Sequence, residues 1–169
     1  MSLILTTPIS DLDIKKMSVR DIVYISGYIY AGRDSVLPKI VDLIKKKKDI
    51  KGVNLVGSVI FHTAVSSAGV GPTSSNKVEI ESSFFDLSRA GVKIHLGKGA
   101  LGDKTVKILK KFNSVYAVVP PISALLSSKI LEKKIVAFPE EGMEALHLLK
   151  VEKLPIIVAI ANGESIYSS

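Results

Sequence analysis

Residues 144–167, "EALHLLKVEKLPIIVAIANGESIY", hold two apolar runs of β type that follow each other without an intervening helix. A short polar connector joins the two runs, and this pattern is typical of a β-hairpin. Elsewhere in the chain, β-type runs alternate with helical periodicities, which favours parallel strands joined by helices. Together the two patterns predict an α/β fold with a mixed sheet.

The remaining elements follow from hydrophobic periodicity. We expect strands over residues 21–30, 53–63, 92–96, 115–119, 135–138 and 156–161, and helices over residues 35–48, 76–89, 100–112 and 122–133. No internal repeat, low-complexity linker or shift in composition divides the chain. We therefore expect a single domain over residues 1–169, in which an N-terminal β layer joins a β/α core.

The composition is that of an ordered globular protein, with 47% hydrophobic and 23% charged residues in a chain of 169. The absence of cysteine excludes disulfides, thiolate zinc sites and any iron–sulfur cluster held by this chain alone. The longest clean apolar run, residues 156–161, is shorter than the about 20 residues that a membrane helix needs. Since the N-terminus also lacks the basic region of a secretory signal, we expect a cytoplasmic protein.

The formal net charge of +7 raises the alternative of a nucleic-acid-binding protein. Much of this charge lies in "KKKK" (residues 45–48), which ends a predicted helix. Lysines at that end complement the helix dipole and stay solvated. No aromatic residues interleave with them, as they do in proteins that bind single strands. A solvated helix end is therefore favoured over a nucleic-acid surface.

Three polar segments that follow predicted strands share glycines and one cation each: "GYIYAGRDS" (residues 27–35), "GVGPTSSNK" (residues 69–77) and "VKIHLGKGALG" (residues 92–102). In open α/β sheets, ligands bind beyond the carboxyl ends of the strands, and helix N-termini there attract anions. The three cations are Arg33, Lys77 and Lys98. If they converge, they suit a small substrate that carries two carboxylates.

Each segment also has a purely structural explanation. A serine of the second segment could cap the following helix, Arg33 and Asp34 could form a surface pair, and Gly97 and Gly99 could serve a turn. Three such segments in one small domain favour binding. The glycines of the third segment match G-x-G-x-x-G, but the acidic residue expected about 20 positions later is missing. A stand-alone anion- or nucleotide-binding module without catalytic activity remains the alternative.

The histidines add little catalytic chemistry. His95 lies inside an apolar strand and is expected to be a packed core side chain. His62 comes shortly before the second segment and is the one histidine considered for the site. No set of acidic residues and histidines has metal-ligand spacing, and no nucleophile–base pair can be named. The residues by themselves predict an anion cradle without catalytic machinery.

Seven segments resemble, in the same order, their counterparts in the β subunit of class I, iron–sulfur-dependent fumarate hydratases and L-tartrate dehydratases. They are "LILTTPIS", "VRDIVYISGYIYAGRD", "IFHTA", "VGPTSSNKVE", "GVKIHLGKGALG", "EEGMEAL" and "PIIVAIANGESIY". The resemblance covers nearly the whole chain. Its most specific parts are the Gly-Pro-Thr-Ser-Ser and Gly-Lys-Gly motifs.

This resemblance implies a swivelling β/β/α fold that works as half of an enzyme. In that family, three cysteines of a partner α subunit hold a [4Fe–4S] cluster with one open iron, which fits the lack of cysteine here. The implied reaction is the reversible hydration of fumarate to L-malate, or the dehydration of L-tartrate. The open iron acts as a Lewis acid on the substrate. The implied assembly is a hetero-oligomer, such as α2β2.

The resemblance also implies roles for individual residues. By motif position, Arg33, Lys77 and Lys98 would bind substrate carboxylates, and Ser75 would add a hydrogen bond. Thr73 would sit near the carbon that exchanges a proton. A threonine hydroxyl is a poor base without an activating neighbour, so that neighbour would come from the α subunit.

Two departures from the family pattern affect the expected site. The family usually has arginine at the position of Lys77, so a bidentate fork becomes a point charge here. The Gly-Pro that follows the histidine motif position in the family is replaced by Val65 and Ser66. The first departure bears on substrate orientation, and the second on any role for His62.

Overall fold

A computed structural model describes residues 2–66, 69–73, 77–120 and 128–167, with the backbone only for residues 66, 69–73 and 77–80. Its elements, in chain order, are β1 (Ser2–Thr6), α1 (Asp11–Lys15), β2 (Ile22–Ala31), α2 (Leu37–Lys45), β3 (Val59–Phe61), β4 (Thr63–Ser66), β5 (Gly69–Thr73), α3 (Lys77–Arg89), β6 (Ile94–Gly97), α4 (Asp103–Lys111), β7 (Val115–Val118), β8 (Ile130–Ala137), the 3₁₀ helix η1 (Pro139–Glu144), β9 (Leu146–Ala161) and β10 (Glu164–Ser165).

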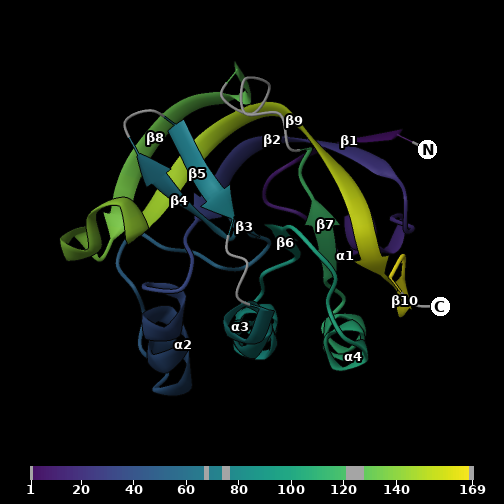
Figure 1. The fold of residues 1–169 in the computed structure, drawn as a ribbon, viewed down its shortest axis with the longest axis horizontal. Helices are drawn as coiled ribbons and strands as arrows, with labels where there is room; N and C mark the ends of the chain where they lie inside the picture. Colours follow the sequence, from purple (N-terminus) through teal and green to yellow (C-terminus); the bar gives the residue numbers. More distant parts are fainter. Residues whose placement is uncertain (1, 67–68, 74–76, 121–127, 168–169) are drawn as a thin grey trace.

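Within the described residues, eight strands form a mixed sheet in which β2, β3, β6 and β7 are parallel neighbours. Strand β9 runs antiparallel to both β2 and β7. These pairings close β2, β3, β6, β7 and β9 into a five-stranded ring, in which β9 joins β2 to β7. Figure 1 shows β9 as a long, arched strand. The expected α/β fold with a mixed sheet is confirmed.

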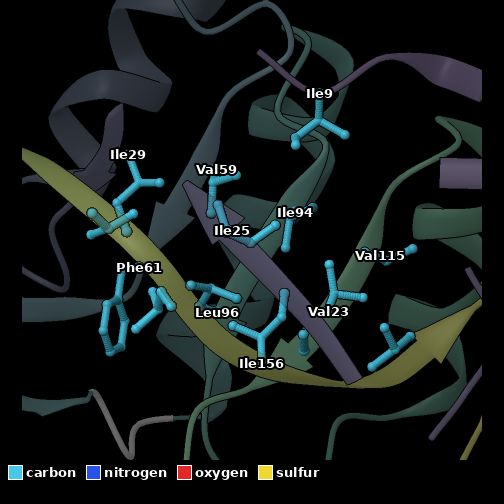
Figure 2. Close-up of a cluster of buried hydrophobic side chains, with 14 of the residues drawn as sticks. Ile9, Val23, Ile25, Ile29, Val59, Phe61, Ile94, Leu96, Val115 and Ile156 are labelled. Carbon is cyan, nitrogen blue, oxygen red and sulfur yellow. The ribbon is translucent and has the colours of Figure 1, made fainter. Parts of the chain in front are cut away.

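The interior of the ring is apolar and buried. Val23 and Ile25 of β2, Ile94 of β6 and Ile156 of β9 point into it (Figure 2), and all four are fully buried. The helices α2, α3 and α4 lie in a row outside the ring (Figure 1). Apolar faces of α2 and α4 complete two further core clusters against it. No helix in the described parts of the chain has the length and apolarity to cross a bilayer.

The hairpin predicted between the two apolar runs of residues 144–167 is wrong, because β9 continues through their polar connector. The chain reverses only further on, at Asn162 and Gly163, where β10 pairs antiparallel with the end of β9. Ile25 of β2 pairs with Leu154, and Gly27 pairs with Val151. Two residues of β9 therefore face one residue of β2, which defines a β-bulge. Lys153 takes the left-handed conformation (φ 50°) there, and its N–H donates to Ser26 Oγ over 2.9 Å. The polar residues bend one strand and do not reverse the chain.

The helix predicted over residues 122–133 is also wrong over its last four residues, 130–133. Residues 121–127 lie outside the described part of the chain, but Ile130–Ala137 forms strand β8. Its partner is β9, for example in the pair Ile135 and His147. Pairing with an available strand edge outweighs the weak helical preference of "ILEKK".

The other expected elements are confirmed in type and differ mainly in length. The expected strand over residues 53–63 shrinks to Val59–Phe61. Strand β1 and helix α1 were not expected; a capping box between Ser10 and Asp13 starts α1. Residues 69–73, expected as part of a loop, form β5 in a two-stranded sheet with β4.

Candidate active site

The carboxyl ends of the four parallel strands meet at one edge of the ring. The N–H of Gly32, which follows β2, donates to Phe61 O at the end of β3 over 3.0 Å. The N–H of His62, which follows β3, donates to Leu96 O in β6 over 3.0 Å. These bonds bring the segments that begin at Gly32, His62 and Gly97 side by side.

The second polar segment reaches this edge through the β4–β5 sheet. Thr73, the last residue of β5, pairs with Thr63, which directly follows His62. Lys77 is the first residue of α3. Ser75 lies outside the described residues, and for Thr73 and Lys77 only the backbone is described. The backbones that carry Arg33, Thr73 and Lys98 thus lie at the same edge of the sheet.

The third segment turns sharply beside Tyr116 of β7. A Cβ on Gly97 would meet the Tyr116 ring at 3.2 Å, and Gly99 has φ +84°, which favours glycine. Tyr116 Oη donates to Gly99 O over 3.1 Å, and burial raises the pKa of this phenol. The Lys98 side chain between the two glycines is exposed.

Arg33 is held in a two-point ion pair with Glu144 of η1. Its Nε donates to Glu144 Oε1 over 2.8 Å, and its Nη2 donates to the same oxygen over 2.5 Å. These contacts raise the pKa of Arg33 above its ordinary value. The exposed Asp34 carboxylate adds a weaker interaction. The sequence did not indicate Glu144 as the partner of Arg33, although it lies in the "EEGMEAL" segment.

His62 belongs to a buried polar chain beneath the edge. Its Nε2 lies 3.2 Å from His95 Nδ1, and His95 Nε2 lies 2.9 Å from Ser88 Oγ of α3. Phe84 stacks on His95 with ring centroids 4.1 Å apart. His62 Nδ1 is buried and has no hydrogen-bond partner among the residues that the structure describes. This series of polar contacts links His62, which directly follows β3, to β6 and α3. These elements precede or carry the polar segments.

Burial keeps both imidazoles neutral. It lowers the pKa of His62 to about 3 and the pKa of His95 well below its ordinary value, and the neighbouring His62 further disfavours a proton on His95. The expectation that His95 is a packed core side chain is confirmed. A neutral His62 can donate or accept a hydrogen bond, but it adds no cation for a carboxylate.

The N-terminus of α4 already holds a carboxylate. Gly102, its N-cap residue, donates its N–H to Glu81 Oε1 over 2.9 Å, and Thr105 Oγ1 donates to Glu81 Oε2 over 2.8 Å. This is the position at which G-x-G-x-x-G proteins place a phosphate. A carboxylate there repels a second anion, so the glycine pattern is better explained by the turn than by a nucleotide.

Replacing Glu81 with alanine should lower the free energy of unfolding by about 1–2 kcal/mol, because the first turn of α4 loses its capping acceptor. Urea unfolding of the purified chain measures this change. The matched control is Glu132→Ala, which removes an exposed carboxylate from β8. Equal stabilities of the two variants would contradict the capping role.

A metal or cluster has no ligand set in the described residues, where no group of three or more histidine, aspartate or glutamate side chains could hold an ion. The sequence also provides no cysteine thiolate. An iron–sulfur cluster therefore does not fit the donors of this chain, and a partner would have to supply its ligands.

Comparison with known proteins gives consistent matches over the length of the chain. A family model described as Fumarase C-terminus matches residues 1–169. L(+)-tartrate dehydratase subunit beta from Escherichia coli (strain K12) is 32% identical over 172 residues, which cover 95% of this chain and 83% of that protein. A Methanocaldococcus jannaschii chain, provisionally given the same name, is 32% identical over 170 residues, covering 92% of this chain and 86% of that protein. A Geobacillus stearothermophilus chain, provisionally named fumarate hydratase class I, is 31% identical over 124 residues, covering 66% of this chain and 22% of that protein.

Proposed function

Because the chain belongs to the Fumarase C-terminus family, we propose that it is the β subunit of a two-component hydro-lyase. Its substrate is a small dicarboxylate, either fumarate, which it hydrates to L-malate, or L-tartrate, which it dehydrates. The α subunit holds the [4Fe–4S] cluster, and the two subunits form a hetero-oligomer in the cytoplasm. The whole chain, residues 1–169, acts as one domain.

The observation that supports this proposal is the common edge at which the polar segments leave β2, β5 and β6. Cations on separate segments suit a ligand with two negative ends, since each carboxylate gains its own charge-assisted hydrogen bonds. Arg33, Lys77 and Lys98 bind the carboxylates, Ser75 adds a hydrogen bond, and Thr73 acts near the carbon that exchanges a proton.

The test is reconstitution of the enzyme. Anaerobic co-expression with a cysteine-bearing α subunit should give a complex that interconverts fumarate and L-malate or dehydrates L-tartrate, and a substrate panel decides between them. The isolated chain should be inactive. Substantial fumarate hydration by the chain alone would overturn the two-component proposal. A tight, salt-resistant complex with nucleic acid would favour the alternative of a nucleic-acid-binding protein.

Replacing Lys98 with alanine should lower kcat/KM about 10- to 100-fold, because a buried carboxylate loses a charge-assisted hydrogen bond of about 1.5–3 kcal/mol. Steady-state kinetics of the reconstituted complex measure this loss. The control is Lys104→Ala, which removes another exposed lysine in the first turn of α4. Near-normal kcat/KM for Lys98→Ala would show that the third segment forms a turn and does not bind the substrate.

Replacing Lys77 with arginine should keep or improve turnover, because it restores the two-point fork that the family usually carries there. Replacing Lys77 with alanine should lower kcat/KM about tenfold, since the charge is lost as well. The same assay compares the two variants. A larger loss with arginine than with alanine would show that this position does not bind a carboxylate.

A further inference from the structure

Glu144 forms hydrogen bonds with Arg33, which lies 111 positions earlier in the sequence. Arg33 Nε donates to Glu144 Oε1 over 2.8 Å and to Oε2 over 3.0 Å, and Nη2 donates to Oε1 over 2.5 Å. The carboxylate therefore engages the Nε/Nη2 edge of the guanidinium. The two side chains are 27% and 25% exposed, so solvent screens this pair less than an ion pair on the open surface.

The segment that presents Glu144 is itself anchored. Lys39 of α2 forms an ion pair with Glu141, which lies on η1 with Glu144. Gly142 has φ +58°, and its carbonyl accepts the Ala145 N–H over 3.0 Å, immediately before β9 begins. Both partners of the pair thus stand on short connections to the ring, with Arg33 two residues after β2 and Glu144 two residues before β9.

We propose that Glu144 is a positioning residue for Arg33: it holds the guanidinium in the orientation in which Arg33 binds a carboxylate of the substrate. This rests on the proposed function of the same site. A guanidinium carries five N–H donors, and Nη1 lies beyond the edge that Glu144 engages. Glu144 and a substrate carboxylate can therefore use different edges of one guanidinium.

The alternative role of Glu144 has the opposite effect on substrate binding. A carboxylate beside Arg33 also neutralises its charge and could compete with the substrate for it. Removing the Glu144 charge would then strengthen substrate binding. Under the positioning role, removal frees the Arg33 side chain to rotate, and binding must order it again, which weakens binding.

Kinetics of the reconstituted complex separate the two roles. Glu144→Gln should raise KM for the dicarboxylate about tenfold and leave kcat within about twofold, the pattern expected when a binding interaction is lost. Glu132→Gln, which removes the charge of an exposed carboxylate on β8, should leave both constants unchanged. In an Arg33→Ala background, adding Glu144→Gln should cause no further loss, because the two residues act as one unit.

A decrease in KM for Glu144→Gln would overturn the proposal in favour of competition. An equal loss in the Arg33→Ala background would overturn it in favour of a general structural role. NMR of the full chain adds a readout that needs no enzyme activity: the Arg33 Nε–H signal should exchange slowly with solvent, and faster in Glu144→Gln only. Fast exchange in the unaltered chain would overturn the positioning role even if the complex is active. Slow exchange in an inactive complex would mean that the proposed function fails and the pair stands.

Discussion

Replacing Thr73 with alanine is expected to lower kcat of the reconstituted complex by about 100-fold or more, with little change in KM. Thr73 is proposed to take part in a proton transfer, and this interaction is made only in the transition state. Loss of the hydroxyl should therefore change the affinity for the substrate very little. Assembly should be retained, because Thr73 pairs with Thr63 through the backbone of the β4–β5 sheet.

Two further variants define the result for Thr73. Thr73→Ser keeps a hydroxyl and should retain most of the activity, whereas Thr6→Ala removes an exposed threonine from β1 and should have no effect. Steady-state kinetics and size-exclusion chromatography of each complex provide the measurements. If Thr73→Ala keeps kcat within about twofold of the original value, Thr73 has no part in the chemistry.

The folded chain is expected to lose stability as the pH falls from 6.5 towards 3. In the folded state the pKa of His62 is about 3, against an ordinary value of 6.5. Between these values the unfolded chain binds a proton that the folded chain refuses, so acid favours unfolding. For His62 alone the loss is about 2 kcal/mol at pH 5. His95 adds to it in the same direction, because its pKa is lowered as well.

Urea unfolding at pH 7.5 and pH 5.0 measures this effect. In a variant with both His62→Leu and His95→Leu, the part of the pH dependence that comes from the imidazoles should disappear, whatever the variant's stability at pH 7.5. The difference between the two pH values is therefore compared within each protein. An equal loss of stability in the variant and the unaltered chain would show that the buried histidines do not cause the acid sensitivity.

Much of the fold follows from local sequence patterns. The helix patterns that lead into Arg89 and Lys111 and the apolar runs around Val23 and Val115 all form the expected kind of element. Their periodicity is a local property, and the burial of one apolar face is its direct consequence. Element ends were less accurate, since capping contacts such as that of Glu81 on α4 come from residues distant in sequence.

The candidate site divides in the same way. Glycines next to a cation, as at Gly32 and Arg33, are visible in the sequence because a strand end and a turn leave a local signature. The partners of these residues are not. Nothing near Arg33 indicates Glu144, and nothing near His62 indicates that its imidazole meets that of His95. The sequence indicated His62 as a candidate residue, but it did not predict that the imidazole is buried and neutral.

The sequence by itself determined the alternation of strands and helices and the polar segments that follow the strands. Only the tertiary structure decided that β9 continues through Glu152 and Lys153 as one bent strand, and that Ile130–Ala137 is a strand. A short polar connector suits a turn and a bulge equally well in isolation. The choice between them is made by β2, whose Ser26 lies opposite the bulge and accepts its N–H. Local patterns set what each segment can form, and pairing between distant strands selects the form that satisfies the backbone hydrogen bonds of both.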